Sequence, residues 1–434
     1  MEARADPLRV LILHRMGHPD HAPRFLPRHV ASFARTHPES VCIVHDVHLP
    51  LPAYVRDAEC DLVLLDVTLL GARWRGDEAR QRLLAELAFL RDCDAVKIAF
   101  PQDEYDCHEV LDDWLCDWRV DGVFSVIDGP RDVLYPRYHR AGRFELGFTA
   151  YLDDELLSRA QRPWAGRPTD LGYRAKKLPP YFGRLGQVKW TIGRDVLARA
   201  AGCGLSMDIA VGDHAAIPGG AWLEFVESCR FMLGANSGSS LLDPRGDIQT
   251  RVRECVRRRP HATFDEIEQE CFAGLDGRHE FTAIAPRNLE AAMLGTGQIL
   301  VDGPYSGILR ANEHYIPLRA DASNFAEVQE RMRDAIEVPE MIARCKATIA
   351  GEVRLTHAHR DARVARVVAL CQRRRPREGS RWRDARDRYE REMSGAYRAL
   401  WKTLEREASA RRWIATAPPL VQSLGRALAR RFRR

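Results

Sequence analysis

The chain has 434 residues, 45% of them hydrophobic and 29% charged, which is enough for two ordinary α/β domains with separate cores. No apolar run approaches the roughly 20 residues that a membrane-spanning helix needs, and the polar start leads directly into a predicted strand, so we expect a cytoplasmic protein without a signal peptide. The net charge of +5 is modest, and the sequence contains no zinc finger or RNP motif, so we expect no nucleic-acid partner.

Short apolar runs, separated by segments of helical length, recur through the first half of the chain. Runs of this kind, rich in Val, Leu and Ile, are typical of parallel strands that are buried on both faces. The predicted strands are Leu8–Leu13, Val41–Val44, Leu62–Leu65, Ala95–Phe100 and Gly122–Val126. We therefore predict a doubly wound α/β domain over residues 1–160, followed by a linker at 162–168 that contains Pro and Gly.

Acidic residues directly follow the predicted strand at 95–100. Asp103, Glu104 and Asp106 surround Tyr105 in the next loop. Ligands of open α/β sheets bind at the carboxyl ends of the strands, so Asp103 and Glu104 are predicted to be catalytic, as an acceptor-binding carboxylate or a general base. Asp106 could instead cap the helix that follows.

Two histidines follow the first predicted strand and should face the same edge of the sheet. His14 and His18 have side chains whose ordinary pKa suits a base near neutral pH, so either could activate an acceptor hydroxyl. Lone histidines are more often structural, and that alternative stays open for both.

The second half of the chain repeats the pattern of the first. A helical segment is predicted at Gly186–Ala201, and the predicted strands are Thr169–Tyr173, Ser206–Ala210, Phe231–Ala235, Phe281–Ala285, Gln298–Val301 and Tyr315–Leu318. A second Rossmann-like domain is therefore expected over residues 161–355. Two such domains facing one another predict a deep cleft between them.

Residues 283–300 are predicted to form a strand, a short helix and another strand. Pro286 should start the helix, Arg287 should lie at its positive end, and Glu290 should follow one turn later on the same side. The helix start and Arg287 suit the phosphates of a nucleotide, and Glu290 could accept hydrogen bonds from sugar or ribose hydroxyls. Arg287 and Glu290 could equally form an ion pair on a solvated helix.

The pattern Pro-Arg-x-x-Glu-Ala at 286–291, followed by Gly and an Ile-Leu strand, resembles the donor-site signature of GT-B glycosyltransferases of the group 1 type, including the spore-maturation-protein-like branch. The resemblance covers roughly residues 165–345. It implies the GT-B fold, with two Rossmann-like domains facing a cleft and a nucleotide-sugar donor held by the second. In that family the helix carries an E-x7-E pair, whereas here Glu290 is followed by Gln298, whose amide can still hydrogen-bond a hydroxyl.

Three cations after the first strand of the second domain extend the resemblance. Arg174, Arg184 and Lys189 are similar in place and type to the residues with which members of this superfamily grip the donor diphosphate. Cations there stabilise the negative charge of a leaving diphosphate without a metal ion. Each of them taken alone could be a surface residue.

Two segments of small residues could also line the cleft. Residues 236–240 are predicted to form a turn in which the backbone of Ser237 and Gly238 approaches a phosphate or sugar, although an ordinary connecting turn is the alternative. The segment 303–307 follows a predicted strand, and its residues Tyr305 and Ser306 are predicted to contact the donor.

The remaining residues, 356–434, are predicted to form a helical, basic extension. Aromatic and Met side chains at helical spacing should pack against the α/β body; they are Trp382, Tyr389, Met393, Tyr397 and Trp401. A second short helix at 420–434 is basic and amphipathic, so peripheral contact with an anionic membrane surface is a further expected interaction.

These features predict an enzyme that transfers a hexose-type sugar from a nucleotide-diphosphate donor to a glycan, lipid-linked or small-molecule acceptor, in surface polysaccharide or glycoconjugate biosynthesis. The cysteines are scattered and form no C-x-x-C pair, and we expect neither a metal ion nor a cofactor. Two alternatives stay open. One is a GT-B-type nucleotide-sugar epimerase, which needs no acceptor site, and the other is an inactive GT-B scaffold, which the Gln298 substitution would suit.

Overall fold

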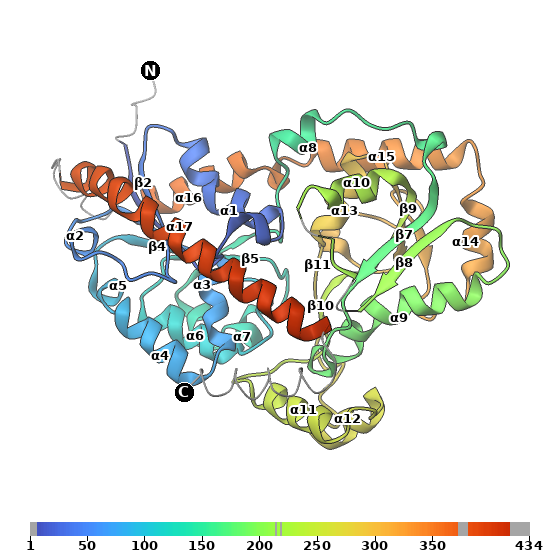
Figure 1. The fold of residues 1–434 in the computed structure, drawn as a ribbon, viewed down its shortest axis with the longest axis horizontal. Helices are drawn as coiled ribbons and strands as arrows, with labels where there is room; N and C mark the ends of the chain where they lie inside the picture. Colours follow the sequence, from blue (N-terminus) through green and yellow to red (C-terminus); the bar gives the residue numbers. More distant parts are fainter. Residues whose placement is uncertain (1–6, 213–214, 218, 372–380, 417–434) are drawn as a thin grey trace.

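The computed structural model describes residues 7–212, 215–217, 219–371 and 381–416. Figure 1 shows two α/β domains side by side, with a long helix, α17, crossing the front of the first domain. Each domain is built on its own parallel sheet. The predicted pair of doubly wound, Rossmann-like α/β domains is confirmed, and the described residues after 356 are mainly helical, as predicted.

The first sheet has the strand order β2-β1-β3-β4-β5-β6, and all its pairings are parallel. Its strands are β1 (Arg9–His14), β2 (Val41–Asp46), β3 (Leu62–Leu65), β4 (Val96–Ala99), β5 (Gly122–Ser125) and β6 (Arg143–Leu146). The five predicted strands are all present. The sixth was missed because β6 is an edge strand whose sequence, Arg-Phe-Glu-Leu, alternates polar and apolar residues instead of forming an apolar run.

Helices cover both faces of this sheet. Val10 and Ile12 of β1 point to the face covered by α1 (Phe25–Thr36) and α16 (His357–Leu370), and Leu11 and Leu13 point to the opposite face. The remaining helices of this part of the chain are α2 (Ala53–Arg56), α3 (Val67–Leu70), α4 (Asp77–Glu86), α5 (Phe89–Asp92), α6 (His108–Asp117), α7 (Arg131–Leu134) and α8 (Asp154–Ser158). Helix α16 thus returns the chain from the second domain to the first.

The second sheet has the order β13-β12-β9-β7-β8 and is also parallel. Its strands are β7 (Thr169–Ala175), β8 (Met207–Val211), β9 (Cys229–Gly234), β12 (Gly297–Val301) and β13 (Ile316–Leu318). Its helices are α9 (Gly183–Arg199), α10 (Ala221–Ser228), α13 (Pro286–Met293), α14 (Phe325–Arg331) and α15 (Glu337–Gly351). The predicted helix at 286 begins at Pro286. The first N–H groups of a helix have no partner within the helix, so proline, which has no N–H, is well suited to this position.

One predicted strand belongs elsewhere. Residues 281–283 form β11 (Phe281–Ala283), which pairs antiparallel with β10 (Ser237–Ser239) outside the main sheet. The prediction that 236–240 is a turn is therefore wrong. Gly238 allows the two strands to approach, because a Cβ there would lie 1.8 Å from the Phe281 carbonyl oxygen. Between these strands the chain inserts α11 (Asp247–Arg258) and α12 (Phe264–Cys271).

Helix α17 (Arg381–Thr416) runs along the edge strand β2, in the same direction as the strand. Trp382 Nε1 donates to the Val41 oxygen at 2.8 Å, and Tyr389 Oη donates to the Val44 oxygen at 3.1 Å. Tyr397 Oη accepts from the amide of Asp46, the last residue of β2, at 3.0 Å. The predicted packing of the aromatic stripe is confirmed, and the helix continues past the carboxyl end of β2.

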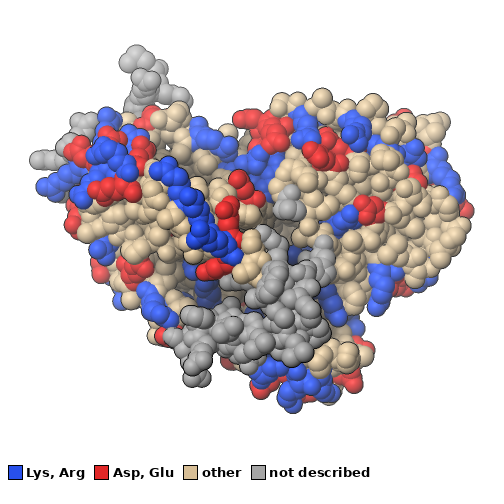
Figure 2. Space-filling view, in the orientation of Figure 1, with Lys and Arg blue, Asp and Glu red and all other residues tan. Residues whose placement is uncertain are grey.

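The opposite face of α17 is polar and charged. Figure 2 shows a row of basic side chains along it, and the exposed residues there include Arg383, Arg388, Arg391, Arg398 and Lys402. None of the described helices is both long enough and apolar enough to cross a bilayer. The predicted helix at 420–434 lies outside the described residues, and membrane contact through it stays a prediction.

Candidate active site

The loop that follows β4 joins the first domain to the second. The amide of Asp243 donates to the Tyr105 oxygen at 3.1 Å, and the amide of His108 donates to the Asp243 oxygen at 3.3 Å. Asp106 does not cap α6, because its carboxylate accepts a hydrogen bond from Gln249 Nε2 of α11 instead. The acidic loop therefore lies where the two domains meet.

A buried arginine fixes the shape of this loop. The Arg73 guanidinium donates to four backbone oxygens, those of Leu70 at 3.0 Å, Gln102 at 2.6 Å, Asp103 at 2.9 Å and Asp106 at 3.0 Å. Asp103 has a positive φ of 49°, which costs a non-glycine residue on the order of 1–2 kcal/mol. The four hydrogen bonds from Arg73 hold that conformation in place.

Asp103 is the exposed carboxylate of the loop. Its Oδ1 accepts a hydrogen bond from Tyr105 Oη at 2.6 Å. Its negative charge also acts on Lys189 of the second domain, where it opposes the lowering of the Lys189 pKa that burial causes. Asp103 therefore lies at the domain boundary with its charge directed toward the second domain, as an acceptor-binding carboxylate requires.

Glu104, the neighbouring catalytic candidate, is completely buried in the first domain. It accepts hydrogen bonds from Ser125 Oγ at 2.7 Å, from the Val126 amide at 2.7 Å and from Tyr135 Oη. Burial raises the pKa of Glu104 to about 7. This side chain ties the β4 loop to the end of β5 and has no surface at which an acceptor could bind.

The two histidine candidates lie apart from each other. His14 is buried at the end of β1, with Nδ1 3.7 Å from Asp46 Oδ2, and burial lowers its pKa, so the ring is neutral at pH 7. His18 caps the short 3-10 helix Pro19–His21 by accepting from the Asp20 amide, and it faces Glu405 of α17. His14 lies at the carboxyl edge of the first sheet, whereas His18 lies against the C-terminal helix.

On the second domain, a lysine and an arginine come together beside the Asp103 loop. Lys189 Nζ donates to Ser237 Oγ at 3.0 Å, and Arg287 Nη1 donates to the backbone oxygen of Arg174 at 2.7 Å. The pKa of Lys189 is lowered to about 8, mainly by burial and also by the nearby charge of Arg287, while the charge of Asp103 acts in the opposite direction. The charges of Arg287 and of Asp103, the latter from the first domain, thus both act on Lys189.

Glu290 lies one turn beyond Arg287, as predicted, but it is buried. It accepts a hydrogen bond at 2.7 Å from Nε1 of Trp222 on α10, and burial raises its pKa. The Arg287 guanidinium lies 5.7 Å from the centre of the same Trp222 ring. Arg287 and Glu290 do not form an ion pair; both contact Trp222 instead.

Gln298 does not join Glu290. It is buried on β12, where Oε1 accepts from Asn288 Nδ2 at 2.9 Å and Nε2 donates to the Asn288 oxygen at 3.2 Å. The pair expected from the family resemblance is therefore split. Gln298 holds the start of α13 against the sheet, and Glu290 alone lies near the domain boundary.

The guanidinium groups of Arg174 and Arg184 bind carboxylates of the second domain. Arg174 binds both carboxylate oxygens of Asp208 at 2.8 Å. Arg184 is exposed and pairs with Asp265 at 3.0 Å and Glu268 at 2.7 Å, both on α12. These carboxylates occupy both guanidinium groups, so of the three predicted cations only Lys189 accompanies Arg287.

Of the small-residue candidates, Ser237 contacts Lys189, whereas Gly238 serves the β10–β11 pairing. Tyr305 is buried, with its hydroxyl donating to the Val301 oxygen at 2.6 Å. Ser306 Oγ accepts from the Ile284 amide at 3.0 Å. Both residues have positive φ, 39° and 53°, and such local strain is concentrated at functional sites.

The sequence did not point to Arg73 or Trp222 as parts of this site. Arg73 follows the mainly apolar stretch 67–72, and a cation directly after an apolar run was the available signal. Trp222 gave none, because a Trp on a helix usually belongs to the core.

No family model matches this sequence, and no curated protein matches it. Distantly similar solved structures include HepE of Anabaena in complex with UDP-glucose, at 12% identity and a TM-score of 0.42, with 84% of this chain and 100% of that chain covered. A DNA-modifying β-glucosyltransferase is 10% identical with a TM-score of 0.46, and the match covers 83% of this chain and 100% of that chain. AviGT4, a glycosyltransferase involved in avilamycin A biosynthesis, is 11% identical with a TM-score of 0.41, and the match covers 84% of this chain and 97% of that chain.

Replacing Arg73 by Met should destabilise the protein by at least about 3 kcal/mol, because several buried carbonyl groups lose their donor at once. Guanidinium unfolding followed by circular dichroism measures this free energy. Arg82→Met is the matched control, since Arg82 is exposed and pairs with Glu78 one turn away, so its loss should cost less than about 0.5 kcal/mol. Equal unfolding midpoints for Arg73→Met and the unsubstituted protein would contradict the account of the loop.

Proposed function

We propose that this protein is a glycosyltransferase whose nucleotide-diphosphate-sugar donor binds between the two domains. The observation that carries the proposal is the placement of Lys189 and Arg287 together, opposite Asp103. Among the described residues, neither cation forms an ion pair: Lys189 donates to a hydroxyl and Arg287 to a backbone oxygen. Two neighbouring cations without a carboxylate partner favour an anionic ligand, and a diphosphate supplies the charge and the acceptor oxygens.

The chemistry follows from these positions. The acceptor hydroxyl oxygen bonds to the anomeric carbon of the sugar while the bond from that carbon to the diphosphate breaks. Asp103 receives the proton of the hydroxyl, and Lys189 and Arg287 stabilise the negative charge that develops on the leaving diphosphate. Asp103 suits this role better than Glu104, because Asp103 is exposed whereas Glu104 is completely buried.

The sugar is placed beside Glu290 and Trp222. Glu290 has a second carboxylate oxygen beyond the one that accepts from Trp222, and this oxygen can accept a sugar or ribose hydroxyl. The indole ring offers an apolar surface to a sugar face. We infer a glycan, lipid-linked or small-molecule acceptor on the first domain, in surface polysaccharide or glycoconjugate biosynthesis. The transferase needs no metal ion in this scheme, since two side-chain cations supply the charge.

Replacing Arg287 by Ala should weaken nucleoside-diphosphate binding roughly 10- to 100-fold, the loss of one charge-assisted contact of about 1.5–3 kcal/mol. A thermal-shift screen of nucleoside diphosphates and their sugar conjugates, beginning with UDP-glucose, identifies the ligand, and calorimetry gives the affinity. Arg194→Ala on α9 is the control, because Arg194 is exposed and pairs with Asp195. Binding that survives Arg287→Ala unchanged would place the donor elsewhere.

The affinity for the diphosphate should fall about tenfold between pH 7 and pH 9. The pKa of Lys189 is lowered to about 8, so its charge is present below that pH and is lost as the pH rises through it. Lys189→Arg keeps the charge over the whole range, so its affinity should stay level. Parallel pH profiles for Lys189→Arg and the unsubstituted protein, measured by calorimetry, would exclude Lys189 from the phosphate site.

An epimerase and an inactive scaffold are separated from the transferase by turnover. A transferase releases nucleoside diphosphate from the bound donor faster when an acceptor is present. Conversion of the donor sugar to an epimer without any acceptor would establish the epimerase, and the absence of binding to every nucleotide tested would favour the scaffold.

A further inference from the structure

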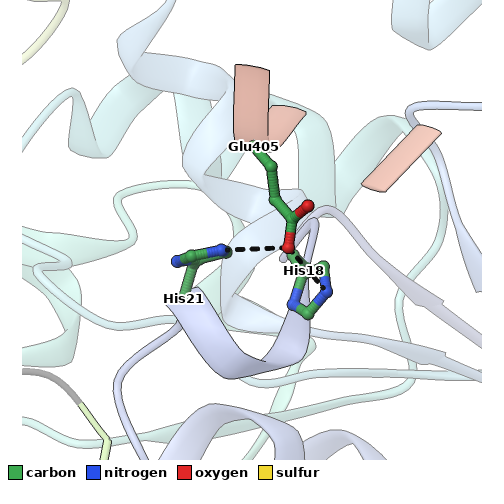
Figure 3. A group of neighbouring side chains, drawn as sticks. All are labelled: His18, His21 and Glu405. Atoms are coloured by element: carbon green, nitrogen blue, oxygen red, sulfur yellow. Dashed lines mark ion pairs between the residues drawn. The ribbon is translucent and has the colours of Figure 1, made fainter. Parts of the chain in front are cut away.

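Two histidines from the loop after β1 meet a glutamate from α17. Figure 3 shows His18, His21 and Glu405 pointing toward one another. Nε2 of each histidine lies 3.6 Å from Oε1 of Glu405, and one potential ligand atom from each of the three residues falls within 4.8 Å of the others. The cluster joins parts of the chain that are almost 400 residues apart in the sequence.

The spacing fits metal ligands better than hydrogen-bonded groups. A separation of 3.6 Å exceeds the range of a nitrogen-to-oxygen hydrogen bond, which ends near about 3.2 Å. Ligands at about 2.0–2.2 Å from a tetrahedral zinc ion lie about 3.4 Å from one another. The three side chains therefore leave between them the distance that one ion would occupy.

We propose that His18, His21 and Glu405 bind a divalent transition-metal ion, most suitably Zn²⁺. Two imidazole nitrogens and one carboxylate oxygen suit zinc, whereas Mg²⁺ and Ca²⁺ prefer sites made of oxygen ligands. The glutamate supplies a negative charge that compensates part of the charge of the ion. The site has three protein ligands and one open position, and it uses no residue of the proposed donor cleft.

Ligation through Nε2 requires the proton of the His18 ring to sit on Nδ1. Without metal, Nδ1 accepts a hydrogen bond from the Asp20 amide at 3.1 Å. The Asp20 carboxylate lies 4.0 Å from the same nitrogen, so a small rotation of the ring or of Asp20 lets it accept the Nδ1 proton. A carboxylate in this place is the usual support of a zinc-bound histidine.

The ion would fasten the far end of α17 to the first domain. Trp401 already lies against His18, with ring centres 5.1 Å apart, and the side chain of Leu404 lies beside Gly17. Beyond Glu405 the helix continues to Thr416, past the carboxyl end of β2. Figure 1 shows this end of α17 in front of the junction of the two domains. Metal binding would therefore hold this part of α17 against the loop that follows β1.

The test is calorimetry with ZnCl₂ on the full chain, made without a polyhistidine tag and freed of metal by a chelator. We expect one ion per chain with a dissociation constant on the order of micromolar or below, and at least about tenfold weaker binding in His21→Ala and in Glu405→Gln. His261→Ala and Glu392→Gln remove an exposed histidine and an exposed glutamate outside the cluster and should bind as the unsubstituted protein does. Hydrogen exchange in residues 381–416 should slow on zinc addition, and it should do so less in His21→Ala.

Cobalt identifies the ligands. A second group of metal-binding side chains, Cys255, Glu270 and Cys271, lies on α11 and α12 and would give a thiolate-to-cobalt charge-transfer band. A cobalt spectrum without that band, altered by Glu405→Gln, is the expected result. A strong thiolate band, or zinc affinities that are equal in the variants and the unsubstituted protein, would overturn the proposal, as would the absence of binding.

Discussion

The hydrogen bonds of Arg73 to four backbone carbonyls are the constraint on which the domain junction depends. A guanidinium buried without a carboxylate partner is costly, and here four oriented carbonyl dipoles offset that cost. The same bonds hold Asp103 in a left-handed conformation and present the loop to the second domain, where Tyr105 and Asp106 bond to the chain around Asp243 and Gln249. The hydrogen bonds of Arg73 thus stabilise both the position of the exposed Asp103 carboxylate and the contact between the two domains.

The electrostatics of the cleft follow from what this loop faces. Lys189 and Arg287 come from different helices, α9 and α13, and both are directed to the boundary by bonds to neutral oxygens. Repulsion between the two cations and the burial of Lys189 both disfavour the charged form of Lys189 when no anion is bound. The pKa of Lys189 is lowered for these two reasons. The negative charge of a bound diphosphate would offset the repulsion between the two cations. This repulsion in the free protein therefore favours binding of the diphosphate.

The strands were predictable where each one is a buried apolar run, because a parallel sheet covered on both faces leaves little room for polar residues. β6 fails this rule at its sheet edge, and β11 satisfies it while pairing outside the main sheet. The Arg287–Glu290 helix was predictable from Pro286 and from its local spacing. The partners of Arg174, Arg184 and Gln298 were not, because Asp208, the acidic residues of α12 and Asn288 meet them only through the tertiary fold.

Photo-crosslinking tests directly whether the donor binds between the domains. A nucleoside diphosphate sugar with a photoreactive base, built on the nucleotide that binds most tightly, is irradiated with the protein, and the labelled peptides are mapped by mass spectrometry. Labels are expected in the segments around Lys189, Ser237 and Arg287, and all of them should be lost when unlabelled nucleotide competes. Competed labels confined to residues 252–267, which line a separate pocket between α9 and the α11–α12 insertion, would contradict binding of the donor between the domains.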